Sequence, residues 1–440
     1  MTTNVVPTYP GVYVESVNKL ALSVGHSATA VPVFAVGTTE TLISEPVRIA
    51  SWMDYSALRI TSGMKSNDGV KNASAELDRA EKNLVRDNAV LTEAQVRLAA
   101  AVTDADKATC TTALATAQTA QTESQNSVKK YQDALAKAKS SVEATATSVG
   151  SYTILDKSLR TYFENGGGYC WLMPVDKLED EIPKHKDITL LVAAGQDIQS
   201  AVTKLCVEGN GLFAILDADK AITDLSTLNH ALEVSEFSAV YFPWLNAKWN
   251  GKTVNDIPPS AAMAGIYCQV DASRGVWKAP ANVALKGGLT PQVKISDDLQ
   301  GQLNRGKAIN MIRDFGDGTP MVWGARTTQD NDHWRYIPVR RLFNSAERDI
   351  RDAMKIAMFE PNSQPTWERV KAAVTRYLHD LWQAGALAGE KPEDAFFVQC
   401  GKGITMDETD INQGKMIVKI GMAAVRPAEF IILQFTQDVA

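Results

Sequence analysis

Two hydrophobic patterns divide the chain, one typical of a long helical hairpin and the other of alternating strands and helices. Between about residues 65 and 150 there is one Tyr but no Phe, Trp or Pro. Apolar residues recur there at multiples of seven, the spacing at which the apolar faces of neighbouring helices meet. The residues of this seam are Leu77, Leu84, Leu91, Leu98, Leu114, Val128, Leu135 and Val142. The pattern predicts an antiparallel helical (coiled-coil) hairpin inserted at 65–150.

Polar residues at 103–106 supply helix-capping side chains and a turn between the two arms. An arm of about 30 residues rising ~1.5 Å per residue would be roughly 45 Å long. The seam is rich in Ala and Thr and is broken once by Asp87, so we expect only modest stability for the hairpin alone. Recognition of a partner and simple spacing are both compatible with it.

Strands and helices alternate on both sides of the hairpin. Apolar strands are expected at 28–36, 169–175, 211–216 and 237–244, with helices at 155–164 and 194–208. This order predicts an outer α/β domain formed by 21–64 and 151–255. Pro258 and Pro259 suggest a boundary near 255, followed by an α+β core over 256–425. In that core, helices are expected at 260–271, 339–358 and 366–384, and strands at 309–313, 321–325, 395–400 and 415–424.

The two ends of the chain read as arms, 1–20 and 426–440. An alternating strand at 12–17 follows two prolines, and the segment 430–436 is almost entirely apolar. A lone terminal strand leaves its backbone groups unpaired, so each is expected to add to a sheet edge in the same or another molecule. The predicted arm residues are Pro10, Gly11, Val12, Tyr13, Val14, Glu15, Phe430, Ile431, Ile432, Leu433 and Phe435.

Composition is that of a soluble globular protein and narrows the classes of function. The 440 residues are 45% hydrophobic and 22% charged, and the net charge of −6 gives no basic field for nucleic acid. No apolar run approaches the ~20 residues that span a bilayer, so no membrane insertion is expected. The first residues lack the pattern of a signal peptide, which predicts synthesis and retention in the cytosol. Five scattered cysteines favour reduced thiols over disulfides.

Three local features were considered as sites of chemistry. The glycines at 166–168 follow a predicted helix and precede a strand, the reverse of a phosphate-binding loop, which favours a helix C-terminus. Asp217 and Asp219 follow a strand as a metal pair would, but no third ligand lies near in sequence. His379 and Asp380 are helix neighbours and point in different directions. We therefore predict no catalytic, metal or cofactor site, and an α/β enzyme using these groups is the alternative.

Nine stretches resemble the contractile tail sheath proteins of phages, tailocins and phage-tail-like injection particles. They are YPGVYVES at 9–16, YFENGGGYCW at 162–171, PPSAAMAGIYCQVDASRGVWKAPAN at 258–282, INMIRDF at 309–315, VWGARTTQDNDHWRYIPVRRLF at 322–343, FEPN at 359–362, LWQAGALAG at 381–389, AFFVQC at 395–400 and RPAEFII at 426–432. The predicted hairpin lies outside the shared pattern.

The resemblance implies a structural subunit that polymerises as stacked hexameric discs into a helical sleeve around an inner tube. On contraction the sleeve would drive the tube through a target envelope, with both arms adding strands to neighbouring subunits. Implied partners are further copies, the tube protein, baseplate and terminal cap proteins, and other sheath paralogues; implied locations are assembly in the bacterial cytoplasm and then a virion tail or a released extracellular particle. A coiled-coil adaptor is a second alternative.

Overall fold

The computed structural model describes residues 23–38, 40, 43–63, 68–101, 103–146, 152–220, 233–316 and 318–429. The two predicted terminal strands, 10–17 and 430–435, lie outside these residues, so every predicted arm residue does too. Side chains are not described at 60–63, 68–73, 105 and 137–146.

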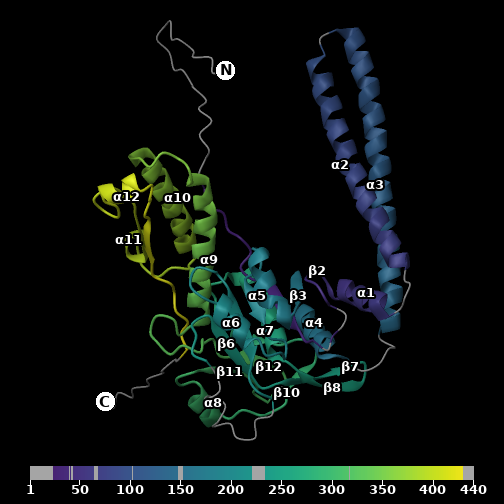
Figure 1. The fold of residues 1–440 in the computed structure, drawn as a ribbon. Helices are drawn as coiled ribbons and strands as arrows, with labels where there is room; N and C mark the ends of the chain where they lie inside the picture. Colours follow the sequence, from purple (N-terminus) through teal and green to yellow (C-terminus); the bar gives the residue numbers. More distant parts are fainter. Residues whose placement is uncertain are drawn as a thin grey trace, which may run out of the picture.

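A nine-stranded mixed sheet forms the centre of the body (Figure 1). Its inner strands run parallel, while β2, β12 and β9 pair antiparallel with their neighbours. The strands in spatial order are β2 (Val47–Ile49), β3 (Cys170–Pro174), β1 (Pro32–Val36), β4 (Leu190–Val192), β5 (Phe213–Asp217), β6 (Ser238–Phe242), β11 (Ile309–Asp314), β12 (Pro320–Trp323) and β9 (Val283–Ala284).

The parallel strands are buried on both faces, which explains their continuous hydrophobic runs. Along β1, Phe34 and Val36 join the cluster that includes residues of α4 (Ile154–Glu164) and α7 (Pro259–Arg274). Val33 and Ala35 join the opposite cluster with α5 (Leu178–Glu181) and α6 (Gln199–Leu205). Two 3₁₀ turns, η1 (Val175–Lys177) and η2 (Ile182–Lys184), flank α5.

The domain boundary predicted near residue 255 is not where the sheet ends. Strand β11 lies beyond that boundary and pairs parallel with β6, and β12 and β9 extend the same sheet. Pro258 and Pro259 begin α7 instead of a linker, because the first turn of a helix tolerates proline. A three-stranded sheet of β10 (Leu289–Pro291), β7 (Leu245–Trp249) and β8 (Lys252–Ile257), and helix α8 (Asp297–Leu303), complete this body.

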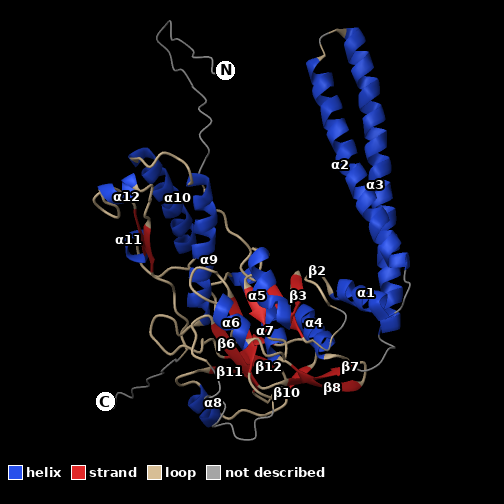
Figure 2. Cartoon of the chain, viewed as in Figure 1, coloured by secondary structure: helices blue, strands red, loops and turns tan. Residues whose placement is uncertain are grey.

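Two long helices project from the body (Figures 1 and 2). After α1 (Trp52–Gly63), α2 covers Asp68–Ala100 and α3 covers Asp104–Ala146, and the two pack along each other. Ala80, Ala94 and Ala117 are buried between them. Leu77, Leu84, Leu91, Leu98, Leu114, Val128 and Leu135 are half-buried, whereas the side chain of Val142 is not described. At the break in the seam, Ser124 donates a 2.5 Å hydrogen bond to Asp87 across the pair.

The remaining unit is built on two helices, α9 (Ile337–Met354) and α10 (Gln364–Gln383). A 3₁₀ turn, η3 (Lys355–Ala357), ends α9, and short helices α11 (Pro392–Ala395) and α12 (Glu408–Asn412) follow α10. The two-stranded antiparallel sheet of β13 (Phe396–Gln399) and β14 (Lys419–Met422) packs against α10. Within the described ranges, no helix combines the length and apolarity that crossing a membrane requires.

Candidate assembly site: the anchors of the two chain ends

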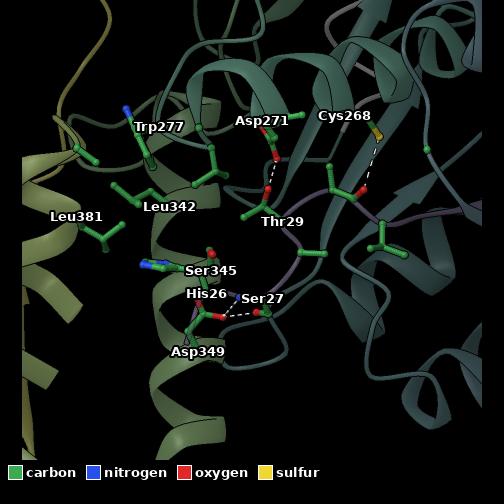
Figure 3. A pocket seen from close by; sticks show the side chains of 18 of the residues that line it. His26, Ser27, Thr29, Cys268, Asp271, Trp277, Leu342, Ser345, Asp349 and Leu381 are labelled. Carbon is green, nitrogen blue, oxygen red and sulfur yellow. Dashed lines mark hydrogen bonds between the residues drawn. The ribbon is translucent and has the colours of Figure 1, made fainter. Parts of the chain in front are cut away.

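The described segment nearest the N-terminal arm is fixed to the body by hydrogen bonds to side chains far away in the sequence. Ser27 donates from its backbone N–H to Asp349 over 3.2 Å, and its hydroxyl donates to the same carboxylate. Tyr377 donates to the other oxygen of Asp349 over 2.9 Å. Burial raises the pKa of Tyr377, which keeps its hydroxyl protonated as a donor. Figure 3 shows Ser27 and Asp349 facing each other beside α9.

A buried ion pair holds the same segment two residues further along. The guanidinium of Arg341 binds both oxygens of Asp271 over 3.0 and 2.6 Å, with side-chain exposures of only 3% and 5%. Thr29 joins the pair twice, since its hydroxyl donates to Asp271 over 2.5 Å and its carbonyl accepts from Arg341 over 3.2 Å. We call the contacts of Ser27 and Thr29 with these partners the N-terminal anchor.

The last described residue of the chain is clamped in a comparable way. Arg326 binds both oxygens of Glu429, at 2.9 Å from Nε to Oε1 and 2.5 Å from Nη2 to Oε2. Asn304 donates to Oε1 over 3.2 Å and Tyr336 to Oε2 over 3.3 Å. Burial alone would raise the pKa of Glu429, but the bonds and charge of Arg326 outweigh it and hold this pKa below its usual range. This group is the C-terminal anchor.

Helix α9 carries both anchors. Tyr336 is its N-cap residue and belongs to the C-terminal anchor, whereas Arg341 and Asp349 lie along the helix and belong to the N-terminal anchor. At ~1.5 Å per residue, Tyr336 and Asp349 are separated by about 20 Å along the helix axis. The helix and its N-cap residue therefore contribute one or more side chains to each anchor.

Arg340 joins α9 to the large sheet. Its guanidinium lies over the rings of Trp334 and Phe237, 4.2 and 4.8 Å from the centroids. It also binds Glu236 over 3.1 Å and Glu347 over 2.9 Å. Because Phe237 directly precedes β6, this stack fixes α9 against the sheet. Cation–π contacts of this kind gain strength when they are desolvated.

Sequence reasoning missed the anchor residues. Arg326, Tyr336 and Arg341 lie in the stretch at 322–343, and Asp271 lies in the stretch at 258–282. These two stretches indicate the family resemblance but not which of their side chains pair. Their partners are distant: 103 residues separate Arg326 from Glu429. The one further signal in the sequence is the presence of charged residues within segments that are otherwise apolar.

Replacing Glu429 by Gln is expected to loosen the C-terminal anchor. A charged, bidentate pair becomes a neutral bond, and hydrogen bonds to charged groups are worth about 1.5–3 kcal/mol. Chymotryptic cleavage after Phe430, followed by mass spectrometry of native protein, should accelerate about tenfold or more. Glu408→Gln is the control, because Glu408 is exposed and its ion pair with Lys402, at 3.4 Å, lies at the surface.

The same anchor should depend on acidity in a defined direction. The folded pKa of Glu429 is depressed, so its contribution is present above the unfolded value of about 4.3 and disappears as pH falls through the lower folded value. The ratio of the cleavage rates of Glu429→Gln and the parent, compared at the same pH so that the acidity dependence of the protease cancels, should thus be unchanged between pH 7 and 5. Equal rates for Glu429→Gln and the parent at pH 7 would contradict the clamp.

The two aspartates considered for a metal are not brought together as ligands. Asp217 accepts hydrogen bonds from the backbone of Gly195 over 2.8 Å, and from the backbone and hydroxyl of Ser260 over 2.7 Å each. Burial raises the pKa of Asp217 to about 6 despite these donors. Asp219 is exposed. Asp217 therefore serves as a helix cap for α7 supplied from β5.

Replacing Asp217 by Ala should destabilise the fold through those unpaired donors. Each buried donor left without a partner costs about 1–3 kcal/mol, so a loss of roughly 2–4 kcal/mol in unfolding free energy is expected by urea titration. Asp219→Ala is the matched control and should cost less than about 1 kcal/mol. A metal-dependent stability of the parent that both variants abolish would refute the capping role.

The other two features also have structural roles. Gly166 and Gly167 donate to the carbonyls of Phe163 and Tyr162, and Gly166 has a φ of +94°, so the predicted helix C-terminus is confirmed. The ring of His379 lies against Trp382, with centroids 5.5 Å apart. Among the described residues, no group of three or more His, Cys, Asp or Glu side chains is placed to hold a metal ion.

No third strand joins the β13–β14 sheet within the described part of the chain, although an isolated antiparallel bridge links Leu387 to Ala424 just beyond the end of β14. Phe397 of β13 is exposed on the face away from Val398, which packs into the cluster around α9 and α10. A sheet of two strands is marginal unless it packs against a helix or gains further strands. The edge of β13, and the edge of β14 before the bridge at Ala424, can therefore accept a strand.

Two family models match consecutive parts of the chain: the phage tail sheath protein central domain over residues 175–328 and the phage tail sheath C-terminal domain over 329–438. Their junction falls between the nine-stranded sheet and α9. A tail sheath protein of Vibrio phage KVP40 is 27% identical over an alignment of 207 positions, and the match covers 43% of this chain. That match covers 28% of the phage protein, so the chain spans only about a quarter of this curated relative.

Solved structures match the chain over nearly its full length. The contracted sheath complex of PVC, an extracellular contractile injection system, is 47% identical, with a TM-score of 0.73 and 99% of each chain covered. The contracted helical sheath of the anti-feeding prophage (AFP) is 36% identical, with a TM-score of 0.65, covering 98% of this chain and 100% of that one. The chain therefore belongs to the contractile tail sheath protein family.

Proposed function

We propose that the chain is the structural subunit of a contractile sleeve, assembled as stacked hexameric rings around an inner tube. The observation that carries this is the 47% identity to a contracted sheath complex across 99% of both chains. Contraction of the sleeve would drive the tube through a target envelope. The tube, baseplate and terminal cap proteins are the partners, and assembly takes place in the bacterial cytoplasm.

The arms would join copies by adding strands to the β13–β14 sheet of a neighbour. One anchor fixes the chain next to each arm, and the sheet has edges that can receive the arm strands of a neighbour. Strand addition uses backbone hydrogen bonds, so the joints can hinge while rings rotate. An arm that changes its direction must be attached to a segment that stays fixed to the body. The charged, buried anchors hold that segment in place.

The work of contraction would come from the difference between two packings of the same subunits. A state is favoured only by contacts that are better in it than in the alternative state. Side-chain contacts between subunits can differ between the extended and the contracted sleeve, whereas the strand joints remain. The hairpin of α2 and α3 lies outside this scheme and stands on the other side of the body from the α9–α10 unit (Figure 1).

Electron microscopy of the expressed full-length chain tests this function. Regular hollow sleeves with stacked rings are expected. Dispersed monomers of the correctly folded chain would contradict the proposal.

A further inference from the structure

An apolar knob protrudes where α9 ends. Ile356, Met358 and Phe359 are 46%, 61% and 101% exposed, so Phe359 has no packing at all in the isolated subunit. Single exposed apolar residues are ordinary, but here three fall within four positions, and exposed apolar residues that gather in one place mark interaction sites. We call these three residues the knob.

The knob stands on a rigid, strained loop. Phe359 has a φ of +67°, an unusual conformation for a bulky residue. The loop is held by Asn362, which donates to the carbonyl of Lys415 over 2.9 Å and accepts from the indole of Trp367 over 2.7 Å. Such strain persists where the surrounding structure imposes it, and it gathers at functional sites. Because Lys415 lies in the segment that leads into β14, the knob and the β13–β14 sheet are parts of one unit.

A cavity of about 580 Å³ lies elsewhere on the same subunit, between α7, α9, α10 and the N-terminal anchor. Trp277, Leu342 and Leu381 line it, as Figure 3 shows, and Ala384 is an exposed residue of its lining. Of its three acidic residues, Asp271 and Asp349 are already bonded within the anchor, and Asp380 is the third. The accessible lining is mostly apolar, and the cavity is of a size that encloses a small ligand or a few side chains.

We propose that the knob of one copy inserts into this cavity of the next copy. A knob and a socket at different places on one chain make a heterologous contact, which generates open helical growth instead of a closed dimer. The AFP relative is a helical sheath, the assembly that such contacts produce. The inference rests on the proposed function and deepens it: strand addition joins the copies, and the knob fixes their relative position beside the N-terminal anchor.

Replacing Phe359 by Ser should leave folding unchanged and reduce the amount of sedimentable sleeve about tenfold or more, as expected for an interface hot spot. Val85→Ser is the matched control, because Val85 is 70% exposed on α2 and lies outside both knob and cavity. Equal sleeve yields for Phe359→Ser and the parent would overturn the inference.

A cross-link measures the contact itself and keeps Phe359 in place. Sleeves of Met358→Cys/Ala384→Cys, treated with a short thiol-specific cross-linker, should give intermolecular products, and Val96→Cys/Ala384→Cys should not. If parent sleeves form normally but Met358→Cys/Ala384→Cys gives no more intermolecular product than Val96→Cys/Ala384→Cys, the insertion of the knob is refuted and the proposed function is not. A parent chain that forms no sleeves would refute the proposed function, and the knob inference with it.

Discussion

Deleting residues 1–17 is expected to leave a folded subunit that no longer polymerises. The deletion removes the predicted strand at 12–17 but keeps Ser27 and Thr29, and with them the N-terminal anchor and the nine-stranded sheet. The backbone bonds that join neighbours are lost, whereas no described core residue is touched. Sedimentation and electron microscopy should show soluble subunits, and urea unfolding should match the parent within about 0.5 kcal/mol.

A control must separate the arm's strand from its length. A variant with residues 1–17 replaced by a Gly/Ser segment of equal length should also fail to assemble, because a flexible chain supplies no alternating side chains for the sheet. Sleeves of normal length from the deleted chain would show that the arm does not join the copies.

Replacing Arg341 by Met is expected to destabilise the subunit by about 3–5 kcal/mol, the cost of leaving one partner of a buried ion pair uncompensated. Asp271 would remain buried with only Thr29 as donor, and the Thr29 carbonyl would keep its bond from Thr189 but lose the one from Arg341. Stacking of the guanidinium on Tyr267, 4.6 Å from the ring centroid, would be lost too. Urea unfolding monitored by tryptophan fluorescence gives the value.

Two variants control for this effect. Arg341→Met/Asp271→Leu removes both charges and should recover much of the lost stability, since apolar replacement of a whole buried pair is often neutral. Arg97→Met breaks an exposed pair with Glu93 on the hairpin and should cost under about 1 kcal/mol. A loss for Arg341→Met no larger than that for Arg97→Met would contradict the anchor.

The pattern of hydrophobic residues predicted the position of most elements, because the side chains that each helix or strand buries determine where apolar residues fall in its sequence. The continuous apolar run at 28–36 reflects a strand whose two faces join two different buried clusters, and β1 occupies Pro32–Val36. The helix expected at 194–208 is shorter, Gln199–Leu205. Ala194 and Gly195 adopt φ values of 49° and 78°, and this turn lets the N–H of Gly195 reach Asp217. A contact across 22 residues leaves no periodic trace in the sequence.

The same limit applies to the candidate site. The anchors join residues that lie 322 positions apart in one case and 103 in another, so no local spacing predicts them. The boundary predicted near 255 does not coincide with an edge of the nine-stranded sheet, because Pro258 and Pro259 are as compatible with a helix start as with a linker and here begin α7. The knob was not predicted, since Ile356 and Met358 fall within the helix expected at 339–358, whereas α9 ends at Met354 and the turn η3 follows.

A cryo-EM map of the assembled sleeve tests the central claim most directly. The account predicts that β13 and β14 of each subunit are flanked by strands contributed by the N- and C-terminal arms of other copies. Arms that pair entirely within their own subunit, with both edges of this sheet left open between neighbours, would contradict it.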